Sequence, residues 1–182
     1  MMNRLSKCVA AAAFLVAPAI LSAQSSAVGF GVSGGLSVPT GDLGDAVDAG
    51  YSVAGHVFLK PSSMKSLRFR GDVSYNGFGY KNIDASYRSL GFVGNAMLDL
   101  STTGGVRPYV LGGLGAFNGK ASTKVGSAAV VSTTSTDVGV QVGGGLNFQL
   151  SGFSTFLELK YVNVFTDGNS SAYIPITFGV RF

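Results

Sequence analysis

The feature that most constrains this chain is an alternation of apolar and polar residues with a period of two, which continues to the last residue. The segment 67–76 shows it most clearly, because Phe69 and Val73 alternate there with Arg70 and Asp72. Successive side chains of a strand point to opposite faces, so this period is typical of strands with one apolar face. Eight such segments follow one another, and they predict an all-β fold. One of them, Arg107–Phe117, is apolar or glycine on both faces, so its phase stays open.

The same alternation fits a soluble barrel with an apolar interior or a membrane barrel with a polar one. Charged residues make up only 12% of the chain, against about 25% in an average soluble domain, which is too few to coat a water-facing surface. The polar faces carry mainly Gly, Ser, Ala, Asn and Gln, which suit a narrow interior. In hydrocarbon every backbone N–H and C=O must be paired, and a closed sheet achieves this without a helix. We therefore predict an eight-stranded antiparallel up-and-down transmembrane β-barrel.

The connections between the segments alternate in length, as in outer-membrane barrels with short periplasmic turns and long external loops. The short ones are Pro61–Lys65, Ser101–Val106 and Ser151-Gly152, and the long ones are Pro39–Gly50, Gly77–Ser86, Asn118–Ser135 and Thr166–Ser171. We expect the segment Asn118–Ser135 to extend its neighbouring strands above the membrane. Aromatic residues near the outer strand ends are expected to form an interfacial girdle. These are Tyr51, Tyr75, Phe78, Tyr87, Phe117, Tyr161, Phe165 and Tyr173.

The N-terminal residues read as a secretory signal peptide. Arg4 and Lys7 precede an apolar stretch, Val9–Leu21, and Ser22-Ala23 supplies small residues for cleavage. The alternative, a membrane anchor, needs roughly 20 apolar residues, and this stretch is shorter. Ala27 is a second candidate for the cleavage site. The predicted division is a signal peptide over residues 1–23 and a barrel domain over residues 24–182.

Three segments carry a resemblance to a known family: Arg107–Gly115, the strand around Glu158–Tyr161, and the closing Phe178–Phe182. Together with the leader, they make residues 27–182 resemble the small eight-stranded outer-membrane barrels, which include the transmembrane domain of outer membrane protein A and the opacity-type surface proteins. The resemblance implies a place in the bacterial outer membrane, in contact with its lipid. It also implies that the outer-membrane assembly machinery reads the last strand, with Phe178, Val180 and Phe182 as the signal. No peptidoglycan-binding domain is expected after Phe182.

The inward faces of the segments collect charged residues. An eight-stranded barrel is just wide enough for its side chains to fill, so these charges are expected to pair with one another. Arg68, Arg70 and Arg181 are the expected partners of the acidic members. The interpretation we favour is an internal polar plug that stiffens the barrel, and the alternative is a narrow or gated conduction path. The predicted lumen network comprises His56, Arg68, Arg70, Asp72, Asp99, Glu158, Lys160 and Arg181.

Few residues point to chemistry. His56 is the only histidine, and a Ser–His–acid hydrolase would need one of the inward serines Ser52, Ser74 or Ser89 beside it. Such a hydrolase usually places these groups at the rim, so we favour a hydrogen-bonded filler. The loop aspartates 42, 45 and 48 fit a solvated acidic loop better than a calcium site. The mature chain has no cysteine, and we expect no cofactor, metal or nucleic-acid partner.

The function predicted from these features is that of a non-enzymatic surface-interaction scaffold, whose outer loops can contact an extracellular ligand. The alternative is a narrow, porin-like passive channel for ions or small solutes, and a lipid-modifying enzyme is a distant third. Inward charge favours the scaffold, whereas a continuous lining of small residues would favour the channel.

Overall fold

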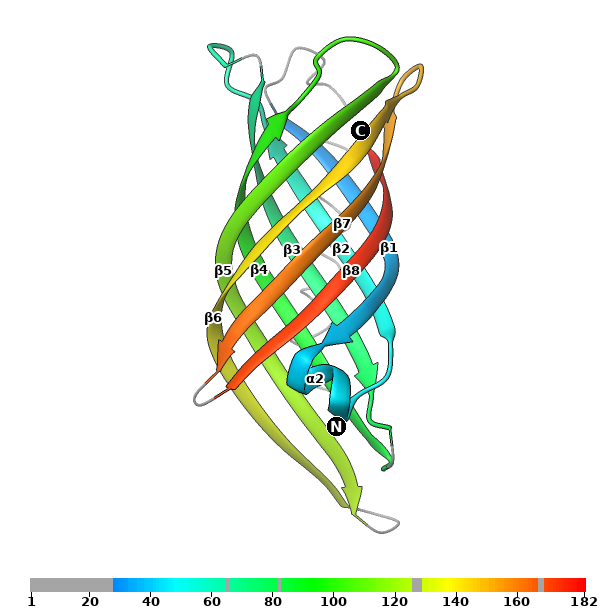
Figure 1. Cartoon of the computed structure of the whole chain (residues 1–182), viewed down its shortest axis with the longest axis vertical. Helices are drawn as coiled ribbons and strands as arrows, with labels where there is room; N and C mark the ends of the chain where they lie inside the picture. The colour runs from blue at the N-terminus through cyan, green and yellow to red at the C-terminus, as the bar shows by residue number, and fades with distance from the viewer. Residues whose placement is uncertain (1–27, 65, 82, 126–128, 167–168) are drawn as a thin grey trace, which may run out of the picture.

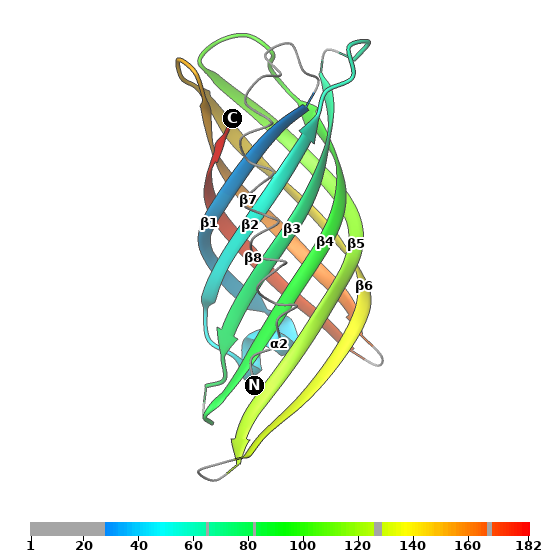
Figure 2. The ribbon, with the colours of Figure 1, turned by 180° about the vertical axis from the view of Figure 1, so that it is seen from behind.

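The computed structural model describes residues 28–64, 66–81, 83–125, 129–166 and 169–182, and these form one closed barrel (Figures 1 and 2). Each strand pairs antiparallel with the next one along the chain, and β1 pairs with β8 to close the sheet. The predicted eight-stranded antiparallel up-and-down barrel is therefore confirmed. The predicted signal peptide, residues 1–23, lies outside the described residues. The elements are β1 (Val28–Thr40), α2 (Gly41–Ala46), β2 (Gly50–Leu59), β3 (Leu67–Gly79), β4 (Ala85–Asp99), β5 (Val106–Val125), β6 (Ala129–Gln149), β7 (Ser154–Thr166) and β8 (Asn169–Arg181).

The apolar faces of the strands point away from the barrel axis. On β3 the exposed fractions of Phe69 and Val73 are 41% and 48%, whereas those of Arg70 and Asp72 are 1% and 3%. The same orientation holds on β2 and β7, so the outside of the barrel is a continuous apolar surface. Of the described residues, none belongs to a helix long and apolar enough to cross a membrane.

The structure fixes the phase of β5, which the sequence leaves open. Tyr109, Leu111 and Phe117 point inward and are buried, while Leu114 is exposed on the outside. Space for these large side chains comes from glycines on neighbouring strands. A Cβ at Gly139 would lie 2.8 Å from the Phe117 ring, closer than Cβ atoms pack. Inward glycines therefore leave room for the aromatic rings, because the lumen is too narrow to hold a ring and a second side chain at the glycine position.

The expected aromatic girdle is only partly correct. Tyr51, Tyr161 and Phe165 are exposed on the outer face, as a girdle requires. Phe78 and Tyr173 are buried inside the barrel instead. Phe117, described above, is likewise interior. Phe78 lies on the same inward face of β3 as Arg70 and Asp72. The lumen near the outer end of the barrel is therefore lined by apolar side chains.

The helix α2 lies at the outer end of the barrel, in the connection between β1 and β2 (Figure 1). This helix was not predicted from the sequence, where the segment was expected to be a loop. Directly after it, Val47 forms an isolated bridge with Tyr80 and is 1% exposed. Lys81 Nζ donates a hydrogen bond of 2.5 Å to the carbonyl oxygen of Gly44. This connection is thus folded over the outer opening of the barrel.

The hairpin of β5 and β6 projects beyond the other strands at the same end, as Figure 1 shows at the bottom of the view. The two strands stay paired up to Val125 and Ala129. This confirms the prediction that the segment Asn118–Ser135 extends the flanking strands.

Candidate functional site

The barrel interior is built in three layers. The outer apolar layer closes the external end and consists of Val47, Phe78, Val93, Phe117, Val162, Val164 and Tyr173. The central polar layer consists of His56, Arg70, Asp72, Asn95, Gln141, Glu158 and Lys160. The inner aromatic layer lies towards the start of β1 and the end of β8 and consists of Phe58, Met97, Tyr109, Leu111 and Phe156. Because the strands alternate strictly, each layer takes residues from neighbouring positions on several strands.

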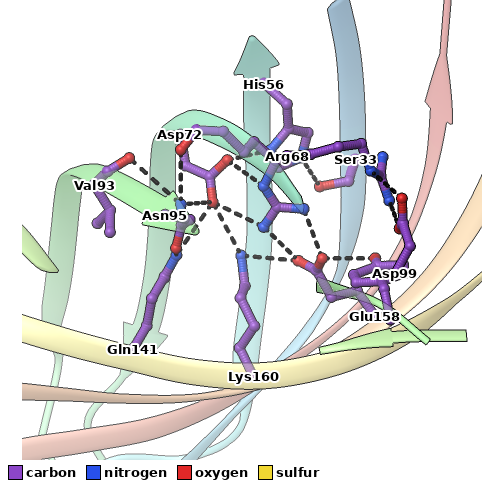
Figure 3. Close-up of polar contacts among 12 residues, drawn as sticks. Ser33, His56, Arg68, Asp72, Val93, Asn95, Asp99, Gln141, Glu158 and Lys160 are labelled. Atoms are coloured by element: carbon purple, nitrogen blue, oxygen red, sulfur yellow. Dashed lines mark hydrogen bonds and ion pairs between the residues drawn. The ribbon is translucent and has the colours of Figure 1, made fainter. Parts of the chain in front are cut away.

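Glu158 on β7 is one centre of the central polar layer (Figure 3). Arg70 Nη1 donates a hydrogen bond of 2.6 Å to Glu158 Oε2, and Arg70 Nη2 donates one of 2.9 Å to Oε1. The hydroxyl of Tyr109 donates to Oε2 at 2.7 Å, and Lys160 Nζ lies 3.2 Å from Oε1. Both oxygens of this buried carboxylate are therefore held by charged or hydroxyl donors, which compensates for its loss of water.

Asp72 on β3 is the second centre. Its Oδ2 accepts hydrogen bonds from Arg70 Nη2 at 2.9 Å, from Asn95 Nδ2 at 3.0 Å and from Gln141 Nε2 at 3.2 Å. Its Oδ1 lies 2.7 Å from His56 Nδ1 and 2.8 Å from Arg70 Nε. Arg70 therefore bridges the two carboxylates, and the layer balances two cations, Arg70 and Lys160, against Asp72 and Glu158.

His56 links Asp72 to β1, because its Nε2 lies 2.8 Å from the hydroxyl oxygen of Ser33. A carboxylate only accepts, so His56 Nδ1 donates to Asp72, and in the neutral ring Nε2 accepts from Ser33. The order Ser–His–Asp resembles a hydrolase triad, but its serine is Ser33 and not one of the inward serines Ser52, Ser74 and Ser89 that the sequence offered as candidates. The His56 side chain has no exposed surface, however, and its ring packs against Phe58 and Phe156 at centroid distances of 5.9 and 5.6 Å. This environment fits a hydrogen-bonded filler better than a base that a substrate must reach.

Two further arginines lie at the end with the short turns. Arg68 donates to both oxygens of Asp99, with Nε at 2.8 Å from Oδ2 and Nη2 bonded to Oδ1. Arg181 was expected to pair with a carboxylate, but within the described chain no ion pair to it is found. Its guanidinium lies over the Phe58 ring instead, 4.8 Å from the centroid. The expectation fails for Arg181 because Asp99 is already occupied by Arg68.

The structure thus brings five of the eight predicted lumen residues into one network of hydrogen bonds and ion pairs: His56, Arg70, Asp72, Glu158 and Lys160. Arg68 and Asp99 form a separate pair, and Arg181 lies over the Phe58 ring. Sequence reasoning missed the roles of Ser33 and Tyr109. The only sequence signal for Ser33 is its place on the polar, inward face of the first segment. Tyr109 lies on the segment for which the sequence did not decide which face points inward. Phe178 and Phe182 are exposed on the outer face of the barrel, at 54% and 71%. Val180 lies between them on that face and is half-buried.

Over the described part of the chain, no cluster of three or more His, Cys, Asp or Glu side chains could hold a metal ion. The three loop aspartates flank or lie in α2 and form no such cluster.

An apolar outer face, a charged and filled interior and a closed sheet together define a transmembrane β-barrel. Residues 9–182 match the model of the outer membrane protein beta-barrel domain. The chain belongs to this family, and it is a protein of the bacterial outer membrane.

Solved structures agree with this assignment at the level of the fold. The chain is similar to Neisserial surface protein A, with a TM-score of 0.63 and 16% sequence identity over 86% of this chain and 96% of that one. It is also similar to Ail, the attachment invasion locus protein of Yersinia pestis, in a phospholipid bilayer nanodisc, with a TM-score of 0.52 and 18% identity over 85% and 99% of the two chains. A second structure of Ail, in complex with the heparin analogue sucrose octasulfate, has a TM-score of 0.50 and 19% identity, and covers 85% of this chain and 96% of that one. No curated protein sequence matches the chain.

Proposed function

We propose that this protein is a non-enzymatic surface-interaction scaffold, in which a plugged barrel holds an external contact surface in the outer membrane. The observation that carries the proposal is the filled interior. The outer apolar layer, the central polar layer and the inner aromatic layer follow one another along the axis, and each contains side chains that are almost fully buried. A lumen filled in this way leaves no continuous lining of small residues for solutes.

The hairpin of β5 and β6 is the part of the contact surface that we expect to matter most. β6 pairs with β7 only from Gly139 onward, opposite Val164, although its pairing with β5 runs to Ala129. Along residues 129–138, no described strand pairs with the other edge of β6. An exposed edge of this kind can add an extended segment of a partner by main-chain hydrogen bonds. The serine and threonine side chains at positions 132–136 are exposed beside it.

A ligand of the external surface is also supported by the similar barrel Ail, which has been solved with a heparin analogue. In this chain Arg88 and Lys120 face each other across β4 and β5 and are both exposed. Like charges placed opposite each other repel, and a polyanion bound between them would relieve that repulsion. An anionic glycan is therefore a reasonable first probe for the surface.

The second candidate is a narrow passive channel. It is favoured by one observation: Glu158 is shared by Arg70 and Lys160, and Lys160 Nζ also lies 3.8 Å from Asp72 Oδ2. A change of partners among these four groups could open a path through the central polar layer without breaking the barrel. The side chains of the outer apolar layer and of the inner aromatic layer would also have to move apart before solutes could pass.

Conductance distinguishes the two candidates. Purified protein in a planar lipid bilayer should give no reproducible current steps if the interior stays filled. Steps that persist after the preparation is shown to be free of other porins would replace the scaffold with the channel. In parallel, cells that display the wild-type barrel should bind a heparin-coated surface better than cells that display the double variant R88Q/K120Q. Equal binding, with both barrels folded by heat-dependent gel mobility, would remove the anionic glycan from the proposal.

We further propose that residues 1–23 are a signal peptide and that Phe178, Val180 and Phe182 are read during assembly. The outward position of the three side chains on the last strand supports this role, because they are accessible before β8 meets lipid.

A further inference from the structure

The end of the barrel with the short turns contains a polar cavity of about 460 Å³, which we call the inner vestibule. The ends of β1 and of β3 to β8, together with the turns after β2 and β6, contribute to its walls. In outer-membrane barrels the short turns face the periplasm, so the inner vestibule opens to that side. Its volume lies within the range of about 300–1,000 Å³ found for small-molecule sites. The inner aromatic layer separates it from the central polar layer.

The inner vestibule carries an excess of positive charge. Four basic side chains line it, those of Lys60, Arg68, Arg107 and Arg181, and the one acidic side chain among its lining residues is Asp99. Asp99 is already bound by Arg68 through two hydrogen bonds. Three basic side chains, from β5, β8 and the turn after β2, therefore line the cavity without an acidic side chain in its wall to neutralise them.

Arg181 is held in place for binding. Its guanidinium lies 4.8 Å from the centre of the Phe58 ring, and Phe58 is itself 3% exposed. An arginine stacked on an aromatic face keeps its N–H groups in the guanidinium plane available to a ligand. Gly29 makes room for this position, since a Cβ there would lie 3.0 Å from Arg181 Nε. Within the described residues, this guanidinium has no hydrogen bond to another side chain.

We propose that the inner vestibule binds a phosphate-type oxyanion, with Arg181 as the central donor and Lys60 and Arg107 as flanking cations. An arginine fork matches two oxygens of such a group, and three unneutralised cations suit an anion of more than one charge. The group has two possible sources, the headgroup of an anionic phospholipid in the inner leaflet or a phosphorylated solute of the periplasm. Polar side chains of Asn147, Gln149 and Ser154 complete the wall and can bond the remaining oxygens.

Two measurements on the folded full-length barrel in maltoside micelles test the proposal and separate the sources. Calorimetric titration with pyrophosphate measures binding of a free anion. Native mass spectrometry counts phosphatidylglycerol molecules that stay on the protein. We expect saturable binding in at least one of them, and R181Q should weaken it by about tenfold or more, as expected when a hydrogen bond to a charged group is lost. Binding of pyrophosphate alone identifies a solute site, and retention of lipid alone identifies a headgroup site.

The matched control is K81Q, which removes one positive charge at the opposite end of the barrel, where Lys81 Nζ donates to the backbone oxygen of Gly44. It should leave binding unchanged. K60Q is a second test variant, because the exposed Lys60 lies just after β2 and its loss cannot unfold the barrel. The proposal is overturned if neither ligand binds saturably, if K81Q weakens binding as much as R181Q, or if neither R181Q nor K60Q changes binding while both remain folded.

Discussion

Replacement of Glu158 by glutamine should destabilise the barrel strongly, because this carboxylate is the acceptor for three different side chains. Arg70 donates two hydrogen bonds to it, Tyr109 donates one, and Lys160 lies 3.2 Å away. A glutamine amide keeps one acceptor oxygen and turns an NH2 group towards donors. The change also leaves Arg70 and Lys160 with Asp72 as their only carboxylate in the central polar layer.

The expected size follows from the burial of the pair. Arg70 and Glu158 side chains both have 0% exposed surface, and removal of one partner of a buried ion pair typically costs about 3–5 kcal/mol. Tyr109 and the amide oxygen of glutamine can retain one bond, so we expect the lower end, about 3 kcal/mol. With a urea dependence of about 2 kcal/mol per molar, this would lower the unfolding midpoint by about 1.5 M.

Urea unfolding of the barrel in lipid vesicles measures this shift. The chain has no tryptophan, so the readout is the near-ultraviolet circular dichroism of its tyrosines together with gel mobility of unheated samples. The control is D137N, which removes one negative charge in the projecting hairpin, where Asp137 Oδ2 accepts from the exposed Ser135. We expect a shift for D137N of less than about 0.5 kcal/mol, as for most surface changes.

A second substitution tests the electrostatic reasoning directly. In the background of E158Q, the change K160Q removes the excess cation and should recover part of the lost stability. An unfolding midpoint for E158Q within error of the wild type, or a double variant less stable than the sum of the single changes, would refute the account of the central polar layer.

Three further predictions concern packing inside the barrel, the connection between β1 and β2 over the outer opening, and assembly. G145A should lower the free energy of unfolding by about 1–3 kcal/mol, because a Cβ there would lie 2.6 Å from the Tyr109 hydroxyl, while G94A, which points to open space, should be near neutral in the same urea assay. V47D should loosen the connection between β1 and β2 and lower the free energy of unfolding by about 2 kcal/mol, because burial of a valine side chain contributes about that much. Proteinase K should then cut this connection faster than in the wild type. Equal cutting rates would contradict the conclusion that the connection is folded over the outer opening. Deletion of Phe182 should reduce the heat-modifiable fraction in the outer membrane yet leave export intact, and normal insertion would show that this residue is dispensable for assembly.

The direction of the strand faces could be read from the sequence because a few residues decide it. Arg68, Arg70 and Asp72 alternate with large apolar residues on β3, and a one-residue change of register would place all three charges in lipid. The β5 strand offers no such marker. Tyr109 and Val110 are both compatible with either face, so the layer that Tyr109 joins became visible only in three dimensions.

The pairing of charges could not be predicted in the same way. Arg70 and Glu158 are 88 residues apart, and their contact depends on the stagger of strands around the closed sheet. Arg181 shows the consequence, since its phase was predicted correctly but its expected partner was already bound. The folded connection between β1 and β2 was not predicted for a different reason. Val47 follows a short helix without a strong apolar period, and its burial depends on the bridge to Tyr80 from another loop.

The central polar layer draws its members from five strands, β2, β3, β4, β6 and β7, so no hairpin of neighbouring strands contains all the partners of Asp72 or Glu158. A half-assembled sheet would expose these ionised groups either to water or to hydrocarbon. Exposure of an ionised group to hydrocarbon costs far too much free energy to occur. Insertion and ring closure should therefore be coupled in time: the nascent sheet stays hydrated on its concave side until the first and last strands meet.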